Sequence, residues 1–341
     1  ISVDAPDNTN DTTPTITGKT DAAEGSTVTI EVTDAKGDKQ TLTATVDKDG
    51  NYSVDVTTPL TEGSYQVTAS VTDPAGNTGT ATDDGSIDVT APVITVDAPD
   101  NTNDTTPTIT GKTDAAEGST VTIEVTDAKG DKQTLSATVD KDGNYSVDVT
   151  TPLAEGSYKA DASVTDKAGN TGKATDDGSV DVTATGKPTV TIVDDTNNDQ
   201  LLSKGEIGDN QVQVKAEVNH TELTAGGTVT LTITNGVATS TIELKLVNGA
   251  LQFANGTAAT DFTYNNGTIS WTENTPADGK SLTVSATQTD KAGNVSEPGS
   301  DTAKVDVTAT GKPTVTIVDD TNNDQLLSKG EITGGGDGVQ V

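Results

Sequence analysis

Hydrophobic and polar residues alternate along much of this 341-residue chain, the pattern expected of strands with one buried face. Residues 27–32 (TVTIEV) and 228–233 (TVTLTI) are clear examples. Seven such runs follow one another at the start of the chain, at about 1–5, 14–19, 26–33, 40–47, 51–57, 64–73 and 78–89. Turn sequences such as Asp49-Gly50 separate them, and no helical period of 3.6 residues appears. Seven short strands of this kind predict an all-β, immunoglobulin-like sandwich.

This pattern is repeated along the chain. The phrase Ile1–Pro6 recurs with one change at Ile94–Pro99, and the residues that follow the two phrases differ at few positions. A third, longer unit starts near Gly186. We therefore expect tandem Ig-like domains in a linear array, with repeat 1 at 1–92, repeat 2 at 93–185, repeat 3 at 186–310 and the start of a fourth at 311–341. The linkers are short and contain proline, which favours defined junctions over flexible tethers.

One twelve-residue segment carries oxygen donors at positions 1, 3, 5, 9 and 12, with a backbone carbonyl available at position 7. These residues are Asp195, Asn197, Asp199, Leu201, Ser203 and Glu206, and they recur as Asp320, Asn322, Asp324, Leu326, Ser328 and Glu331. This is the spacing of an EF-hand loop, which surrounds Ca²⁺ with six to eight oxygens. The flanking sequences predict strands. Gln200 stands where an EF-hand loop has glycine, and this replacement bears on how sharply the loop can turn and so on its affinity for Ca²⁺. Asp, Asn and Ser are also common turn residues. Three carboxylates in a spacing repeated verbatim nevertheless favour calcium.

Composition limits the possible partners. Asp and Glu number 53 against 20 Lys and Arg, which gives a net charge of −33. All the basic residues are lysine, and a surface this acidic repels nucleic acid and anionic membranes. Cysteine is absent, so neither disulfides nor thiolate sites are possible. No apolar run reaches the ~18–20 residues of a membrane span, so we expect no membrane insertion in this segment. The chain begins at Ile1 without a leader, and we expect it to be an internal piece of a longer protein.

The sequence offers little for catalysis. His220 is the only histidine, and the absence of cysteine and arginine leaves no nucleophilic triad and no histidine-based zinc site. We expect His220 in a surface turn. Trp271 alternates like a core residue of a strand, and we expect it to be buried rather than to stack on a sugar. We therefore expect no enzyme.

Several phrases resemble a known family. They are Val71–Asn77 with its counterparts Asp166–Asn170 and Asp290–Asn294, the linker-to-strand phrase Ala91–Asp97, and the Asp195 loop. In these phrases the chain resembles bacterial Ig-like repeats from the extender regions of giant RTX-type surface adhesins of Gram-negative bacteria. The resemblance implies type I secretion, an extracellular location at the cell surface, and Ca²⁺ bound at or near the junctions between repeats.

The topology of a seven-strand sandwich suggests which residues meet at a junction. The turn after the sixth strand of repeat 2, with Asp166 and Asn170, should lie at its entry end together with Glu117. Asp88 and Thr90, at the exit of repeat 1, should approach from the other side. The equivalents elsewhere are Asp181 with Asp290 and Asn294, and Asp73 with Asn77; a second acidic cluster, with Asp7 and Asp11, recurs with Asp100 and Asp104. For each set, a role in turn formation explains the residues equally well.

The expected function is that of a monomeric, calcium-stiffened spacer, whose partners are calcium ions and the neighbouring repeats of the same chain. Such a spacer would hold a distal binding domain of a surface adhesin away from the cell. Two alternatives stay open: a binding module for carbohydrate or a host protein, and accessory repeats of a secreted hydrolase.

Overall fold

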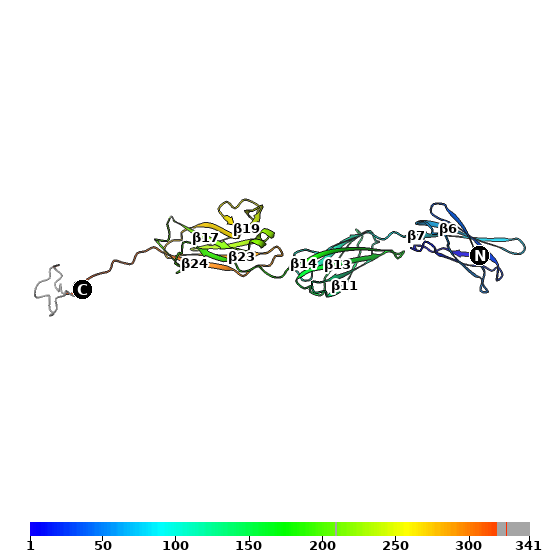
Figure 1. The fold of residues 1–341 in the computed structure, drawn as a ribbon, viewed down its shortest axis with the longest axis horizontal. Helices are drawn as coiled ribbons and strands as arrows, with labels where there is room; N and C mark the ends of the chain where they lie inside the picture. The colour runs from blue at the N-terminus through cyan, green and yellow to red at the C-terminus, as the bar shows by residue number, and fades with distance from the viewer. Residues whose placement is uncertain (209, 319–324, 326–341) are drawn as a thin grey trace. The chain divides into compact units, whose positions relative to one another are not determined.

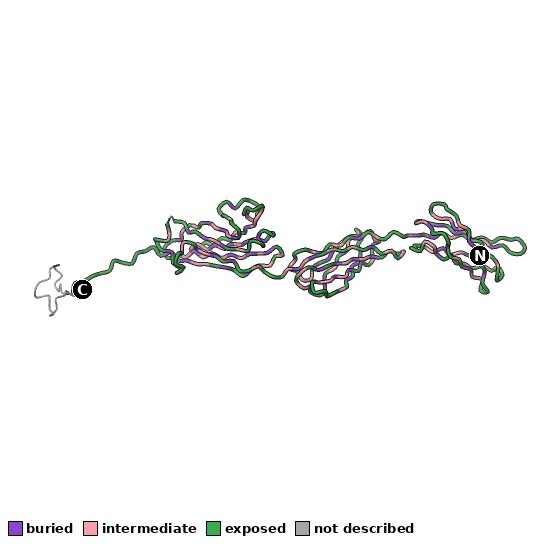
Figure 2. Tube along the Cα trace, in the orientation of Figure 1, coloured by how far each residue is buried: buried purple, intermediate pink, exposed green. Residues whose placement is uncertain are grey.

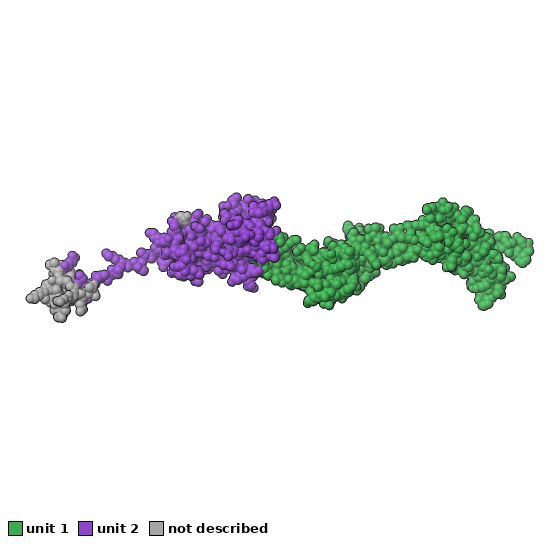
Figure 3. Space-filling model, in the orientation of Figure 1, with its two compact units in different colours: residues 1–185, 225–227, 289–296 green, residues 186–224, 228–288, 297–341 purple. Residues whose placement is uncertain are grey.

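The computed structural model describes residues 1–208, 210–318 and 325. Strands dominate it, which confirms the all-β prediction, and a single short helix occurs among the described residues (Figure 1). The chain divides into two compact units (Figure 3). The first comprises residues 1–185, 225–227 and 289–296, and the second comprises 186–224, 228–288 and 297–341. No helix in the described part of the chain is both long and apolar enough to cross a membrane.

Repeat 1 is a two-sheet sandwich of seven strands, each at the place that the alternation predicts. They are β1 (Ser2–Asp4), β2 (Thr15–Lys19), β3 (Thr27–Thr33), β4 (Lys39–Thr45), β5 (Asn51–Asp55), β6 (Gly63–Thr72) and β7 (Thr78–Ile87). One sheet has the order β1-β2-β5 and the other β4-β3-β6-β7, and all of these pairs are antiparallel.

Repeat 2 has the same construction. Its strands are β8 (Ile94–Asp97), β9 (Thr108–Thr113), β10 (Thr120–Thr126), β11 (Lys132–Thr138), β12 (Asn144–Asp148), β13 (Gly156–Thr165) and β14 (Thr171–Val180). The sheets are ordered β12-β9-β8 and β11-β10-β13-β14. In both repeats a tyrosine hydroxyl donates to the backbone of the first strand, from Tyr52 to Ser2 at 2.6 Å and from Tyr145 to Thr95 at 2.5 Å. Burial raises the pKa of Tyr145 to about 12, so this hydroxyl stays a donor at neutral pH.

Repeat 3 is a larger sandwich. It contains β15 (Thr189–Ile192), β16 (Leu201–Ser203), β17 (Gln211–Glu217), α1 (His220–Ala225), β18 (Thr228–Asn235), β19 (Ala238–Val247), β20 (Ala250–Phe253), β21 (Thr263–Asn265), β22 (Thr268–Asn274), β23 (Ser281–Thr289) and β24 (Gly299–Asp306). Its sheets are ordered β15-β17-β22-β21 and β16-β24-β23-β18-β19-β20. The short β16 pairs in parallel with β24.

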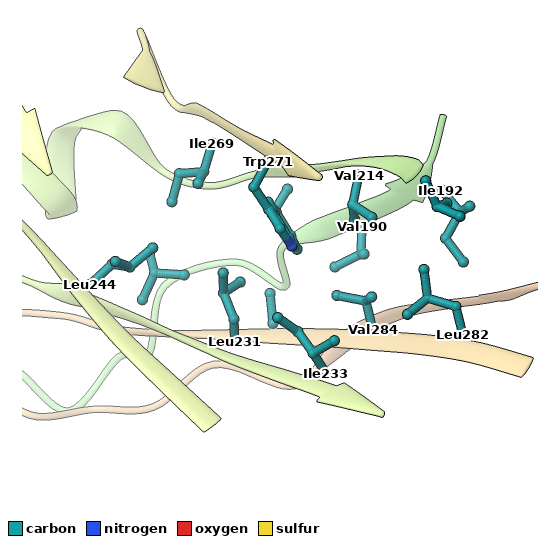
Figure 4. Close-up of a cluster of buried hydrophobic side chains, with 14 of the residues drawn as sticks. Val190, Ile192, Val214, Leu231, Ile233, Leu244, Ile269, Trp271, Leu282 and Val284 are labelled. Carbon is teal, nitrogen blue, oxygen red and sulfur yellow. The ribbon is translucent and has the colours of Figure 1, made fainter. Parts of the chain in front are cut away.

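The cores follow from the alternation, because every second residue of a strand turns inward. Buried and exposed positions alternate along the chain in Figure 2. In repeat 3, Val214, Leu231 and Val284 lie between the two sheets (Figure 4). Trp271 is 6% exposed and its ring lies 5.7 Å from that of Phe262, which confirms the predicted core position.

The helix α1 corrects one expectation. His220 is exposed, as predicted, but it opens this helix rather than a turn. The side-chain oxygen of Asn219 caps the helix by accepting from the backbone N–H of Thr221 at 3.0 Å, while Leu223 is fully buried. A cap and one buried leucine suffice to form a single helical turn against the sandwich, too short to produce a helical period in the sequence.

Candidate metal loop and repeat junction

The loop from Asp195 to Glu206 follows β15 and contains β16. Asp195 is 6% exposed, and its carboxylate organises the first half of the loop. One oxygen accepts from the backbone N–H of Asp199 at 3.1 Å, and the other accepts from that of Gln200 at 2.9 Å. The carboxylate of Asp199 in turn accepts from the N–H of Leu201 at 2.9 Å. Three consecutive amides are therefore turned towards acidic side chains.

Gln200 adopts the left-handed conformation that the glycine of an EF-hand loop favours at this position. Its φ is 66°, and Gln325 at the equivalent position of the second copy has a φ of 69°. A residue with a Cβ pays an energetic penalty in this region. The sharp turn is therefore compatible with glutamine, at a conformational cost that glycine avoids.

The second half of the loop closes on itself through Glu206. One carboxylate oxygen of Glu206 accepts from the N–H of Ser203 at 3.0 Å and from its hydroxyl at 2.8 Å. The other oxygen accepts from the hydroxyl of Thr196 at 3.0 Å. Hydrogen bonds from Ser203, and then from Thr196, lower the pKa of Glu206 below its usual value.

These donors suit a hard cation because all of them are oxygens. Among residues 1–208, 210–318 and 325, however, no three acidic, histidine or cysteine side chains converge around a common point. The ligand set of Asp195, Asn197, Asp199, Leu201, Ser203 and Glu206 therefore stays a prediction. The second copy, with Asp320, Asn322, Asp324, Leu326, Ser328 and Glu331, lies outside the described residues.

The turn after the sixth strand of repeat 2 meets the exit of repeat 1, within the first compact unit. The carboxylate of Asp166 accepts from the backbone N–H of Asn170 at 2.9 Å and from its side-chain amide at 3.0 Å. The same amide nitrogen donates to the backbone carbonyl of Asp88 at 2.9 Å. Burial opposes ionisation of Asp166, but the hydrogen bonds from Asn170 outweigh it and lower its pKa. The expected meeting of Asp88 with this turn is therefore present.

Two other residues of that predicted set are placed differently. The hydroxyl of Thr90 donates to the carboxylate of Glu62 at 2.8 Å, within repeat 1. Glu117 is exposed, and no hydrogen bond found in the described structure joins it to Asp88 or to Asp166. Here the side chains at the ends of the strands, which the sequence does not orient, decide the contacts.

The acidic cluster at Asp7 and Asp11 lies beside Asp88, a proximity that the sequence did not predict. Thr9, between the two acids, pairs in parallel with Ile87 at the end of β7. Its N–H donates to the carbonyl of Ser86 at 3.2 Å, and its carbonyl accepts from the N–H of Asp88 at 3.0 Å. In repeat 2, Asp100 and Asp104 flank Thr102, which makes the same pairing with Val180 and accepts from the N–H of Asp181 at 2.9 Å.

The remaining members of the predicted sets occupy equivalent turns. Asp73 and Asn77 in repeat 1 form the internal hydrogen bonds seen for Asp166 and Asn170, and both are exposed. Asp290 is 5% exposed and accepts from Asn294. The amide of Asn294 also donates to the carbonyl of Asp181 at 2.8 Å, a contact assigned to the first compact unit.

Comparison with protein families matches two models, both described as bacterial Ig-like domain. One matches residues 2–91 and 95–183, and the other matches residues 191–307. The chain belongs to the bacterial Ig-like domain family. The matches follow the three sandwiches, and the family resemblance inferred from the sequence is confirmed. A search of curated proteins found no match.

Among solved structures, the chain is similar to three from bacterial adhesins. A tetra-tandem repeat in the extending region of a large adhesion protein is 29% identical, with 89% of this chain and 73% of that chain covered and a TM-score of 0.28. A Ca²⁺-stabilised adhesin of an Antarctic ice-binding bacterium is 28% identical, with 91% and 74% covered and a TM-score of 0.40. A 1.5-MDa bacterial ice-binding adhesin is 23% identical, with 90% and 97% covered and a TM-score of 0.43. At these TM-scores the matches do not establish a common geometry for the whole chain.

Proposed function

We propose that this chain is an extracellular spacer from a bacterial surface adhesin, in which bound calcium stiffens a series of Ig-like repeats. The observation that carries the proposal is the tandem of two nearly identical sandwiches and a third, larger one. A spacer needs only repeats that fold and join in the same way, so nearly identical copies fit a spacer better than a site specific to one ligand. The extending region of the large adhesion protein named above contains a tetra-tandem repeat.

In this function the loop from Asp195 to Glu206 is the principal calcium site. Asp195, Asn197, Asp199, the carbonyl of Leu201, Ser203 and Glu206 would hold the ion. Glu206 would exchange its hydrogen bonds to Ser203 and Thr196 for the ion, which neutralises the repulsion among the three carboxylates. An ion at ~100 times its Kd stabilises the folded state by about 2.7 kcal/mol per site. That is a large share of the ~5–15 kcal/mol that holds a typical domain together.

The junctions would supply further ligands. Asp7, Asp11 and Asp88 lie at the exit end of repeat 1, where Asp166 of repeat 2 also lies. An ion there would reduce the repulsion among these acids, and fix the angle between successive repeats. In a chain with a net charge of −33, the remaining charge keeps neighbouring molecules apart.

The only tryptophan offers a local test of the principal site. Trp271 lies in the core of repeat 3, the sandwich that also carries Asp195 to Glu206, so its fluorescence reports the unfolding of that domain. We expect calcium to raise the melting temperature of the wild type well above its value in chelator. The variant E206Q should lose much of this rise, because it removes the charge of the twelfth position.

The variant E31Q is the matched control. It makes the same chemical change at Glu31, a half-exposed residue of repeat 1 that pairs with Lys39 and lies outside every predicted site. Its calcium response should equal that of the wild type. A wild-type melting temperature that is the same with calcium and with chelator would refute the proposed site.

A further inference from the structure

We propose that the turn Asp166–Asn170 joins repeat 2 to repeat 1 by a direct contact that requires no metal ion. The proposal goes beyond the calcium-dependent function, because the atoms that carry it are an amide nitrogen and a backbone carbonyl. Neither atom carries a charge or titrates, and the amide nitrogen cannot act as a ligand to calcium. The amide nitrogen of Asn170 makes the contact, so the amide oxygen stays available to an ion.

The turn is preformed. The same Asp-x-Ala-Gly-Asn sequence occurs at residues 73–77, 166–170 and 290–294. In each copy the aspartate carboxylate accepts from the backbone N–H and from the side-chain amide of the asparagine four residues later. The turn therefore adopts one shape whether it is exposed, as in repeat 1, or half-buried, as in repeat 2. A rigid turn loses little conformational entropy when it docks.

The surface that receives the turn is also fixed. Two backbone hydrogen bonds, from Thr9 to Ser86 and from Asp88 to Thr9, hold the end of β7 against the loop between β1 and β2. This orients the carbonyl of Asp88 towards the amide of Asn170, at 2.9 Å. A hydrogen bond of this kind contributes a net ~0.5–1.5 kcal/mol. Because the turn of repeat 2 and the end of β7 are both already ordered, little of this is lost as conformational entropy when the two repeats dock.

Gly169 brings the two repeats close together. Its φ is 97°, a conformation that disfavours any side chain. A Cβ added to it would also lie 3.2 Å from the side-chain nitrogen of Asn10, in the loop of repeat 1 beside Thr9. Glycine at this position therefore permits both the positive φ of the turn and the close approach of the Asn10 side chain. Asn294 and Asp181 make the same amide-to-carbonyl contact at 2.8 Å, and Gly293 lies against Asn103 in the same way.

The test is a distance measurement between spin labels in the whole chain, with calcium removed by chelator. The chain has no cysteine, so the substitutions K48C and K141C provide one label in each of the first two repeats. These lysines occupy equivalent turns, and their side chains are 74% and 75% exposed. Double electron–electron resonance then gives the distribution of distances between repeats 1 and 2.

We expect a narrow distribution for the labelled wild-type chain in chelator and a broader one for N170A, in which the ratio of docked to undocked molecules falls about 2- to 12-fold. The matched control is N77A, which removes the same side-chain hydrogen bond from the exposed turn of repeat 1 and should leave the distribution unchanged. A broad wild-type distribution in chelator, or equal distributions for N170A and N77A, would overturn the proposal. Neither result depends on the calcium response of Trp271, so the two proposals can fail separately.

Discussion

Repeats 1 and 2 differ in their cores at one fully buried position on the central strands. Val67 on β6 and Ala160 on β13 are equivalent, and both are 0% exposed. Each pairs with an equivalent valine of the neighbouring strand, Val32 in repeat 1 and Val125 in repeat 2. A second core difference, Ile87 on β7 and Val180 on β14, lies near the ends of those strands, and both changes leave repeat 2 with less buried apolar volume. The reciprocal substitutions V67A and A160V measure how much the first difference contributes to the free energy of unfolding of each repeat.

The magnitude follows from the atoms removed. Val67 carries two more carbon atoms than Ala160, and burial of each is worth ~0.8 kcal/mol. The cavity left by truncation adds to this, so V67A should destabilise repeat 1 by about 2 kcal/mol. That corresponds to a factor of about 30 in the unfolding equilibrium. The substitution A160V should stabilise repeat 2, by less than this if its core has already closed around the alanine.

Hydrogen exchange measured by mass spectrometry separates the two repeats. Thr68 of β6 is replaced by Asp161 in β13, so peptides from the two strands have different masses in the wild type and in both variants. We expect β6 to be better protected than β13 in the wild type, V67A to lose protection in repeat 1 only, and A160V to gain it in repeat 2 only. Unchanged protection in V67A, or a loss of protection in A160V, would refute this account of the cores.

Two further predictions concern single positions. Burial raises the pKa of Glu273 above its usual value despite a hydrogen bond from Trp271, so folding loses stability as the pH rises from the unfolded pKa through the raised one. The variant E273Q should therefore melt at a higher temperature than the wild type at pH 7, with the difference vanishing below about pH 4; Trp271 fluorescence measures this, and a pH-independent difference would contradict it. A Cβ at Gly172 on β14 would overlap the carbonyl oxygen of Pro92 in the linker, whereas at the equivalent Gly79 it would lie 3.4 Å from a methyl carbon of Ile1. Calorimetry should show that G172A destabilises its repeat by ~1–3 kcal/mol and G79A by less, and the reverse order would contradict the assigned path of the linker.

The strands were predictable from the sequence because local alternation determines which face of a strand is buried. Trp271 was placed correctly for the same reason. The segment Leu201–Ser203 was not, because it lies inside the predicted metal loop and gains its strand character from parallel pairing with β24, about a hundred residues later. Leu202, which is fully buried, was the available signal.

The junction was predictable in part. Sandwich topology placed Asn170 near Asp88, and the structure brings them into contact. The sequence did not show that Asp7 and Asp11 lie at the same end, because that depends on the isolated pairing of Thr9 with Ile87, far apart in the chain. Nor did it show that the hydroxyl of Thr90 would bond within its own repeat. Side-chain orientations of this kind are set by packing at the strand ends rather than by local sequence.

Small-angle X-ray scattering with calcium and with chelator tests the stiffening of the repeats most directly. A chain whose junctions are fixed by bound ions should have a larger maximum dimension and a narrower range of conformations in calcium. In chelator the average dimension should fall, because acidic residues such as Asp88 and Asp166 no longer share an ion and the junction retains only its direct contacts. Scattering profiles that coincide in the two conditions would contradict calcium stiffening.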